Sequence, residues 1–303
     1  MPPTIDYREA AAHYRAGGNV MQLLRDAAPD GLNSPEAVLT AYDLQAGSYV
    51  RAMQQPEHRA AMDEYTRALA GLLDRLEADS VLEAGVGEAT TLAHVARLMQ
   101  RRPRRAAGFD ISWSRIFTGL EYAASQRISA ELFVADLFAT PLPDGAFDVV
   151  YTSHSIEPNR GREREALAEL HRIAGRYLVL LEPAATLGNA ATQDRIRRHG
   201  YCTGLHAAAL DLGYTVREHR LFEVCTAEAN QTELIVIEKR ATDRATSRPL
   251  WSCPQCRAEL TSHAGHWFCR RCSRVYPVIA GIACLAPGQG ILAGRFADAP
   301  CDA

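Results

Sequence analysis

From residue 80 onward, short runs of apolar residues alternate with longer segments in which apolar residues recur every three or four positions. Short apolar runs bounded by turn residues are typical of buried strands, whereas the longer period is typical of amphipathic helices. Strands that alternate with helices in this way form a parallel sheet with helices on both faces. The pattern therefore predicts a doubly wound α/β fold.

We expect seven strands, at residues 80–83, 106–110, 131–135, 147–152, 177–181, 215–222 and 232–238. The helices that accompany them are expected at residues 89–101, 112–126, 161–174, 190–199 and 204–212. Only a loop separates the last two strands, so we expect this pair to lie antiparallel at the edge of the sheet.

The segments on either side of this pattern have a different character. Residues 1–77 show helical spacing and no strand signal, which predicts an N-terminal helical cap. Residues 240–249 are polar and end at Pro249, as expected of a linker. We therefore divide the chain into a helical cap at 1–77, an α/β domain at 78–241 and a small C-terminal module at 250–303.

Charge and hydropathy exclude two simple classes of function. The formal net charge is -3 and the isoelectric point is near 6.4, so no overall positive charge draws the chain to nucleic acid. The N-terminus lacks the apolar segment of a signal peptide, and no stretch approaches the roughly 18 apolar residues of a membrane span. We therefore expect a soluble, cytoplasmic protein without a membrane partner.

The first expected strand ends in a glycine turn that suits a ligand-binding loop. Glu83 is followed by Gly85 and Gly87, and glycine allows both a sharp bend and a close approach of a ligand to the backbone. A dinucleotide-binding turn would carry a third glycine where Thr90 stands. The acidic Glu83 also suits an ammonium ligand better than a pyrophosphate, so the dinucleotide interpretation is weakened.

Further acidic residues follow in order along the next strands. Asp110 ends the second strand, Asp136 follows the third, and the fourth runs into Ser153 and His154. Together with the glycine turn, this order resembles the class I S-adenosylmethionine-dependent methyltransferases over about residues 79–240. The resemblance implies a Rossmann-like sheet of seven strands, with Asp110 on the ribose hydroxyls and Asp136 on the adenine amine of S-adenosylmethionine.

The resemblance also extends to the cap and shows one departure. Many relatives carry a third glycine where this chain has Ala89. The segment 41–49 resembles the Tyr-Asp entry segment that small-molecule methyltransferases place over the cofactor, although a core or surface role for its tyrosines is equally open. The implied cofactor site consists of Tyr42, Gln45, Tyr49, Glu83, Gly85, Gly87, Thr90, Asp110, Ile111, Ala135, Asp136, Leu137 and Ser153.

Two residues after the fourth strand are candidates for catalysis. His154 and Glu157 follow this strand on the carboxyl edge of the sheet, where ligands of open α/β folds bind. If the methyl acceptor is an alcohol, its proton must leave, and His154 would act as the base while Glu157 orients the substrate. The alternative is that His154 packs on the cofactor and Glu157 caps the turn or helix after Pro158.

Four of the eight cysteines form two Cys-x-x-Cys pairs near the C-terminus. Cys253 and Cys256, with Cys269 and Cys272, offer the four thiolates of a tetrahedral zinc site, and zinc supplies folding free energy that so small a module lacks. With the segment 276–285, the pairs resemble the small zinc-binding partner that activates several tRNA, rRNA and protein methyltransferases. That resemblance implies a docking or allosteric module, whereas the alternative is a purely structural zinc.

Three functions are compatible with these features. The leading hypothesis is a methyltransferase that O-methylates a small-molecule or carbohydrate acceptor, with the N-terminal helices forming the acceptor pocket. The alternative is an RNA or translation-factor methyltransferase that docks its substrate on the zinc module, for which the basic clusters 101–105 and 270–271 would speak. The third is a non-catalytic protein that binds the cofactor without turnover.

Overall fold

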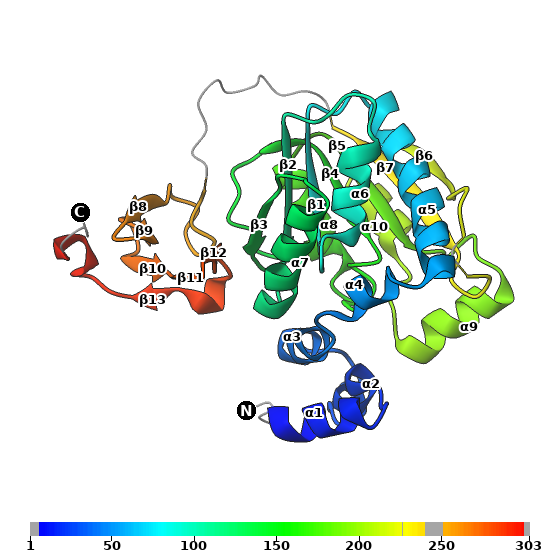
Figure 1. Ribbon diagram of the computed structural model, residues 1–303, viewed down its shortest axis with the longest axis horizontal. Helices are drawn as coiled ribbons and strands as arrows, with labels where there is room; N and C mark the ends of the chain where they lie inside the picture. Colours follow the sequence, from blue (N-terminus) through cyan, green and yellow to red (C-terminus); the bar gives the residue numbers. More distant parts are fainter. Residues whose placement is uncertain (1–5, 226, 240–250, 300–303) are drawn as a thin grey trace.

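The computed structural model describes residues 6–225, 227–239 and 251–299. N-terminal helices, a seven-stranded sheet with helices on both faces, and a small β-rich module follow one another along the chain (Figure 1). The linker expected at 240–249 lies outside the described residues. Within the described ranges, no helix has the length and apolarity needed to cross a membrane.

The central sheet has the strand order β3-β2-β1-β4-β5-β7-β6. β1 pairs in parallel with β2 and β4, and β7 lies antiparallel between β5 and β6. The chain changes direction across the sheet between β1 and β4, and ligands of open α/β sheets bind at the carboxyl ends of strands at such a point. The strands are β1 (Ser80–Ala84), β2 (Arg105–Asp110), β3 (Glu131–Val134), β4 (Phe147–Ser153), β5 (Ala174–Pro183), β6 (Thr215–Leu221) and β7 (Thr232–Glu238).

Successive strand residues enter two different apolar cores. Val81 and Val149 pack on one face of the sheet with Leu92 of α6, and Leu82 and Val150 pack on the other face with α8 and α10. A sheet covered on both faces needs nearly continuous apolar strands, which is why the strands could be found in the sequence. The covering helices are α6 (Thr90–Leu98), α7 (Trp113–Ser125), α8 (Glu163–Ile173), α9 (Ala190–His199) and α10 (Leu205–Asp211).

The N-terminal cap is helical, as predicted. Its first three helices each begin at an Asp, Asn or Ser whose side chain accepts a backbone N–H, the usual stabilisation of a helix start. They share a small apolar cluster of their own, and the long fifth helix packs on the sheet. The helices are α1 (Tyr7–Arg15), α2 (Val20–Asp26), α3 (Pro35–Leu44), α4 (Ser48–Ala52) and α5 (Pro56–Arg75).

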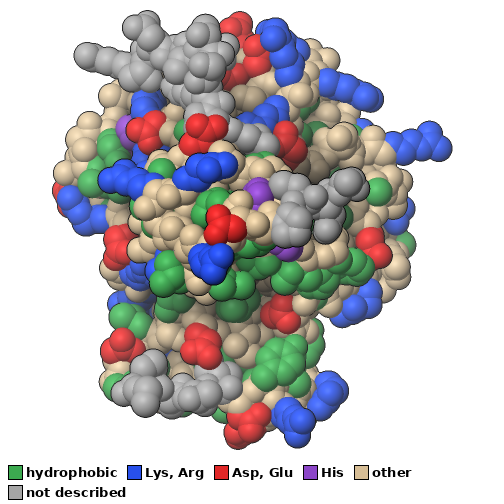
Figure 2. All heavy atoms as spheres, turned by 90° about the vertical axis from the view of Figure 1, so that its left-hand side faces the viewer, with side chains coloured by type: hydrophobic (Ala, Val, Ile, Leu, Met, Phe, Trp, Pro, Cys, Tyr) green, Lys and Arg blue, Asp and Glu red, His purple; other side chains and the backbone are tan. Residues whose placement is uncertain are grey.

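The C-terminal module lies beside β3 (Figure 1). It contains the antiparallel sheet β13-β10-β9-β8 and the hairpin β11-β12. On the side where the module faces the viewer, acidic and basic side chains are interspersed and a belt of hydrophobic side chains crosses the face (Figure 2). The strands are β8 (Thr261–His263), β9 (His266–Cys269), β10 (Arg274–Tyr276), β11 (Val278–Ile279), β12 (Ile282–Ala283) and β13 (Ile291–Leu292), with short 3-10 helices at Pro287–Gln289 and Phe296–Asp298.

The module is joined to the edge of the central sheet. The N–H of Leu285 donates to the carbonyl of Val134 at 2.8 Å, and Val134 forms a parallel bridge with Cys284. The ring of Trp251 meets Phe133 edge-on, with 4.6 Å between ring centroids. The module therefore covers part of an edge strand that would otherwise present unpaired backbone groups.

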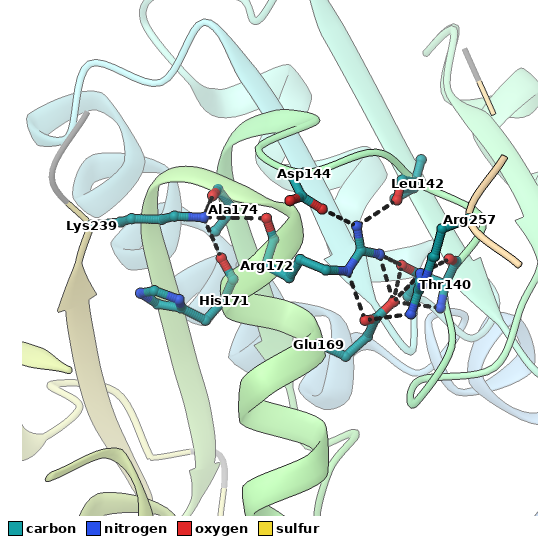
Figure 3. A network of polar contacts seen from close by, with 9 residues as sticks. All are labelled: Thr140, Leu142, Asp144, Glu169, His171, Arg172, Ala174, Lys239 and Arg257. Carbon is teal, nitrogen blue, oxygen red and sulfur yellow. Dashed lines mark hydrogen bonds and ion pairs between the residues drawn. The ribbon is translucent and has the colours of Figure 1, made fainter. Parts of the chain in front are cut away.

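A charged network adds to this attachment (Figure 3). Arg257 of the module donates to the carboxylate of Glu169 on α8 at 3.0 Å and to the carbonyl of Thr140 at 2.9 Å. Glu169 also accepts from Arg172 at 2.8 Å and from the Thr140 hydroxyl at 2.6 Å. Burial alone would raise the pKa of Glu169, but the hydrogen bonds from Arg172, Thr140 and Arg257 outweigh burial and lower it. The carboxylate is thus held in its charged form between the two parts.

All seven predicted strands are confirmed, and the last two are antiparallel at the sheet edge as expected. The helix predicted at 89–101 ends earlier, at Leu98, because Met99 already has an extended backbone with ψ 132°. The fifth strand begins earlier than predicted, at Ala174, because this residue ends α8 in an extended conformation and no loop intervenes.

Candidate active site

The glycine turn after β1 brings the backbone close to two later segments. Gly85 has φ +73°, and a Cβ at this position would lie 2.3 Å from the Cβ of Ser155. Gly87 has φ +53°, and its N–H donates to Asp110 at 3.1 Å. Ala89 has φ +54°, so it keeps the left-handed backbone expected of the third glycine at a cost of about 1 kcal/mol. The departure at Ala89 therefore leaves the shape of the turn intact.

Two buried carboxyl groups stand at the ends of β1 and β2. Glu83 accepts from the Tyr151 hydroxyl at 3.0 Å, and burial raises the pKa of Glu83 to about 8 although that hydrogen bond lowers it. Asp110 accepts from the N–H of Ser112 at 2.9 Å, and burial raises the pKa of Asp110 against the opposing charge of Arg115. A ligand that offers a cation or hydrogen-bond donors would favour the charged forms of both groups.

A cavity of about 230 Å³ opens at this carboxyl edge. Asp136, after β3, is half-buried at its wall and accepts from the N–H of Phe138 at 2.9 Å. Gln45 ends α3 and does not line the cavity. The cofactor candidates that the structure brings together around it are Tyr42, Tyr49, Glu83, Gly85, Gly87, Thr90, Asp110, Ile111, Ala135, Asp136, Leu137 and Ser153.

Two tyrosines of the cap line the cavity, and an arginine of α7 lies against both of their rings. The guanidinium of Arg115, on α7, lies 4.9 Å from the ring centroid of Tyr42 and 4.4 Å from that of Tyr49. Its Nε also donates to the carbonyl of Tyr42 at 3.1 Å. Because Arg115 is only 3% exposed, these cation–π contacts form away from water, where each is worth up to about 2 kcal/mol. Arg115 therefore ties α3 and α4 to α7.

Glu88 holds the start of α4. This fully buried carboxylate accepts from the N–H of Gly47 at 3.0 Å and from that of Val50 at 2.8 Å. Neither Glu88 nor Arg115 was among the residues proposed from the sequence, because their partners lie some 40 to 70 residues earlier in the chain. The one available signal was an acidic residue directly after Gly87, in a turn that is otherwise small and apolar.

His154, directly after β4, has an unusual backbone conformation. Its φ is +53°, a region that non-glycine residues rarely occupy and that concentrates at functional sites. Nδ1 lies 3.2 Å from the carboxylate of Glu157, and Nε2 lies 2.8 Å from the Thr232 hydroxyl. The carboxylate of Glu182 accepts the backbone N–H groups of residues 155–157 and so fixes this turn.

The charges around His154 determine its protonation. Burial lowers the pKa of His154, but the hydrogen bond to Glu157 and the charges of Glu157 and Glu182 outweigh burial, and the net pKa is raised. Burial raises the pKa of Glu182 to about 7. Glu157 does not line the cavity, and α8 begins at Glu163 without a side-chain cap. Glu157 thus contacts His154 and does not cap the following helix.

The four cysteines of the module converge on one point. Their Sγ atoms all lie within 4.8 Å of one another, with Cys253 and Cys272 at 3.6 Å and Cys256 and Cys269 at 3.5 Å. A tetrahedral zinc ion with Zn–S bonds of about 2.3 Å places its thiolates about 3.8 Å apart. The Tyr276 hydroxyl lies 3.4 Å from the Cys253 sulfur and orients it. The donor set and its spacing fit zinc.

Comparison with known proteins agrees with this geometry. Residues 81–175 match a family described as a methyltransferase domain. The chain is similar to magnesium protoporphyrin IX methyltransferase of Synechocystis PCC 6803, solved with bound SAH, with 13% identity, a TM-score of 0.51 and coverage of 66% of this chain and 98% of that one. It is also similar to a chain of the complex between the Trm112 methyltransferase activator and a methyltransferase of Haloferax volcanii, with 15% identity, a TM-score of 0.50 and coverage of 65% and 96%. A search of curated proteins gave no match.

The matched segment contains the glycine turn and the carboxylates that line the cavity. Both structural matches share the seven-stranded, Rossmann-like fold that the sequence predicted. The chain therefore contains a methyltransferase domain, as expected of an enzyme that uses S-adenosylmethionine. The module lies beyond the matched segment, and its relation to the zinc-binding activator stays a prediction.

Proposed function

We propose that the chain transfers a methyl group from S-adenosylmethionine to an oxygen atom of a small-molecule or carbohydrate acceptor. The observation that carries this proposal is the roof over the donor cavity. Tyr42 and Tyr49 belong to the cap, yet they line the same cavity as Gly85 and Asp110. A site closed by ordered helices excludes water and suits a small-molecule acceptor better than a macromolecule.

The cavity residues fit the parts of the donor. When bound, S-adenosylmethionine supplies a methyl group on a positively charged sulfur. Asp110 would accept hydrogen bonds from the ribose hydroxyls, and Asp136 would accept one from the adenine amine. Gly85, without a side chain, lets the donor approach the backbone closely. Glu83 would face the donor's ammonium group, directly or through water.

The raised pKa of Glu83, about 8, makes donor binding dependent on pH. Below pH 8 this carboxyl is mostly protonated, and a cationic ligand favours its charged form. Binding should therefore release a proton, and affinity should rise toward pH 8 by up to about tenfold per pH unit. Calorimetry between pH 6 and 8 in two buffers of different ionisation enthalpy measures this release. Equal release by Glu83→Gln would assign the proton to another group.

In this proposal, His154 takes the acceptor's proton. It lines the cavity next to Ser153, and Glu157 stabilises the protonated ring. The Thr232 hydroxyl can donate to the neutral ring and accept from the protonated one, so both charge states keep a partner. Because the neutral ring is the base, kcat should rise with pH through the raised pKa of His154.

Methylation of RNA is the alternative, and the zinc module is the observation that favours it. A chain similar in fold comes from a complex with the Trm112 methyltransferase activator. The charges speak against it, because Arg101 and Arg104 lie beside Asp79, and Arg105 pairs with Glu131. These arginines precede or begin β2, at the edge of the sheet opposite the cavity.

Methyl transfer from donor labelled with tritium in the methyl group tests the proposal. We expect label in hydroxylated small molecules, with loss of turnover but unchanged donor affinity in His154→Gln. His206→Gln, on α10, is the matched control. Label in RNA that falls steeply with salt would support the alternative. Tight donor binding without label in any acceptor would support a non-catalytic role.

A further inference from the structure

A second and larger groove lies beside the donor cavity. Its volume is about 890 Å³, within the range of roughly 300–1,000 Å³ typical of small-molecule sites. Residues of α1, α2, the loop between α2 and α3, and the start of α3 form most of its wall, and residues 160–162 close it from the side of the α/β domain.

The wall of this groove is largely apolar. It includes Leu23, Leu24, Ala28, Pro29 and Leu32. Leu23 is 36% exposed and Leu32 is 39% exposed, so both present apolar surface to water. Covering such surface with an apolar ligand is favourable.

The charges at the groove have both signs. Asp6, Glu9, Asp30 and Glu36 contribute acidic groups, and Arg160 and Arg162 contribute basic ones. Such a mixture offers no concentrated positive charge for a phosphate backbone. Selection in this groove therefore depends on apolar contact more than on charge.

The groove and the donor cavity adjoin each other. Pro35 lines both of them, and Asn159 lines the donor cavity while its neighbour Arg160 lines the groove. The Asn33 side chain donates to the carbonyl of Pro158 at 2.8 Å, which holds α3 against this turn. The groove therefore ends at residues 160–162, directly after Asn159 of the donor cavity.

We propose that the groove binds the apolar body of the methyl acceptor, and that the acceptor is an elongated, mostly apolar molecule with a hydroxyl group at the end nearest His154. This inference rests on the proposed function and narrows it away from carbohydrates. In the reaction, the acceptor oxygen forms a bond to the methyl carbon while the bond from that carbon to sulfur breaks. The electron pair stays on sulfur, the hydroxyl proton passes to His154, and S-adenosylhomocysteine leaves.

Binding of the neutral fluorescent probe N-phenyl-1-naphthylamine to the full chain tests the groove. We expect one saturable site in the wild type and at least a tenfold weaker affinity in Leu23→Arg and in Leu32→Arg. Leu210→Arg is the matched control, because Leu210 is 53% exposed on α10 and lines neither cavity. S-adenosylhomocysteine should bind all three variants like the wild type, which shows that the fold and the donor cavity are intact.

Two results would overturn the inference. One is probe binding that is absent, or that is unchanged by both groove substitutions. The other is a compound that accepts the labelled methyl group but does not displace the probe. Failure of the proposed function looks different, since a well-folded wild type would then bind no S-adenosylmethionine or transfer no methyl group, whatever the probe does.

Discussion

The two additions to the α/β domain are attached in opposite ways. In the C-terminal module, Trp251, Leu260 and Tyr276 belong to the same buried apolar cluster as Phe133 and Leu178 of the domain. Helices α1–α3 of the cap instead keep a small cluster of their own. The module is therefore part of the domain's core, whereas α1–α3 can shift without exposing that core.

Helix α3 and the start of α4 are held above the cavity by polar contacts. Glu88 binds the start of α4, and the Ser112 hydroxyl donates to Asp43 at 2.7 Å. Polar contacts of this kind can open and reform locally, as the roof of an active site must do to admit substrate. The difference teaches that this protein combines a fixed C-terminal module with a movable roof over the cavity.

Loss of the predicted zinc site should have the largest effect. Structural zinc contributes on the order of 10 kcal/mol in small zinc modules, so we expect Cys253→Ser to lower the free energy of unfolding by at least about 3 kcal/mol. Because the core is shared, calorimetry should show one transition at lower temperature. Cys225→Ser is the control, since Cys225 is exposed and outside the cluster. A separate early transition of the module, with the main transition unchanged, would show that the two parts fold independently.

Weakening the contacts that hold the roof should have the second-largest effect. Glu88→Gln weakens hydrogen bonds to a charged group worth about 1.5–3 kcal/mol, so we expect donor affinity to fall about tenfold. Hydrogen exchange should quicken at residues 47–50, while the midpoint of thermal unfolding changes little. Glu121→Gln, at an exposed site on α7, is the matched control. An unfolding midpoint that falls as far as in Cys253→Ser would contradict the distinction between the fixed module and the movable roof.

Substitutions of two arginines, one in each addition, should have the smallest effects on the free energy of unfolding. Arg257 joins the module to Glu169, and Arg25 joins the cap to the backbone carbonyls of residues 198 and 199. Arg257→Met should lower the free energy of unfolding by about 1–2 kcal/mol, since Glu169 keeps its bonds to Arg172. Arg25→Met should change it by less than about 0.5 kcal/mol. Urea denaturation measures both, and equal losses would contradict the account.

The sequence predicted what depends on local pattern. β4 is buried along almost its whole length, so its middle appears as a short apolar run, and the glycine turn with Asp110 lies at short, regular spacing. Contacts between distant segments left no such pattern. Glu88 and Gly47 are 41 residues apart, and Arg257 and Glu169 are 88 apart.

The same limit explains the module and the groove. The two Cys-x-x-Cys pairs predicted a separate zinc-binding unit, but neither pair carries a sign of the core that the unit shares with the domain. The groove arises where three cap helices meet residues 160–162, and each of these segments alone looks like an ordinary surface helix or turn. Both the shared core and the groove arise from packing between elements that are distant in the sequence.

Calorimetric titration with S-adenosylmethionine tests the central claim most directly. We predict that the wild type binds the donor and that Asp110→Asn binds it about 10- to 100-fold more weakly, because a hydrogen bond to a charged group is worth about 1.5–3 kcal/mol. Asp211→Asn, at an exposed site on α10, should bind like the wild type. Absence of binding by well-folded wild-type protein would contradict the assignment of the cavity to the methyl donor.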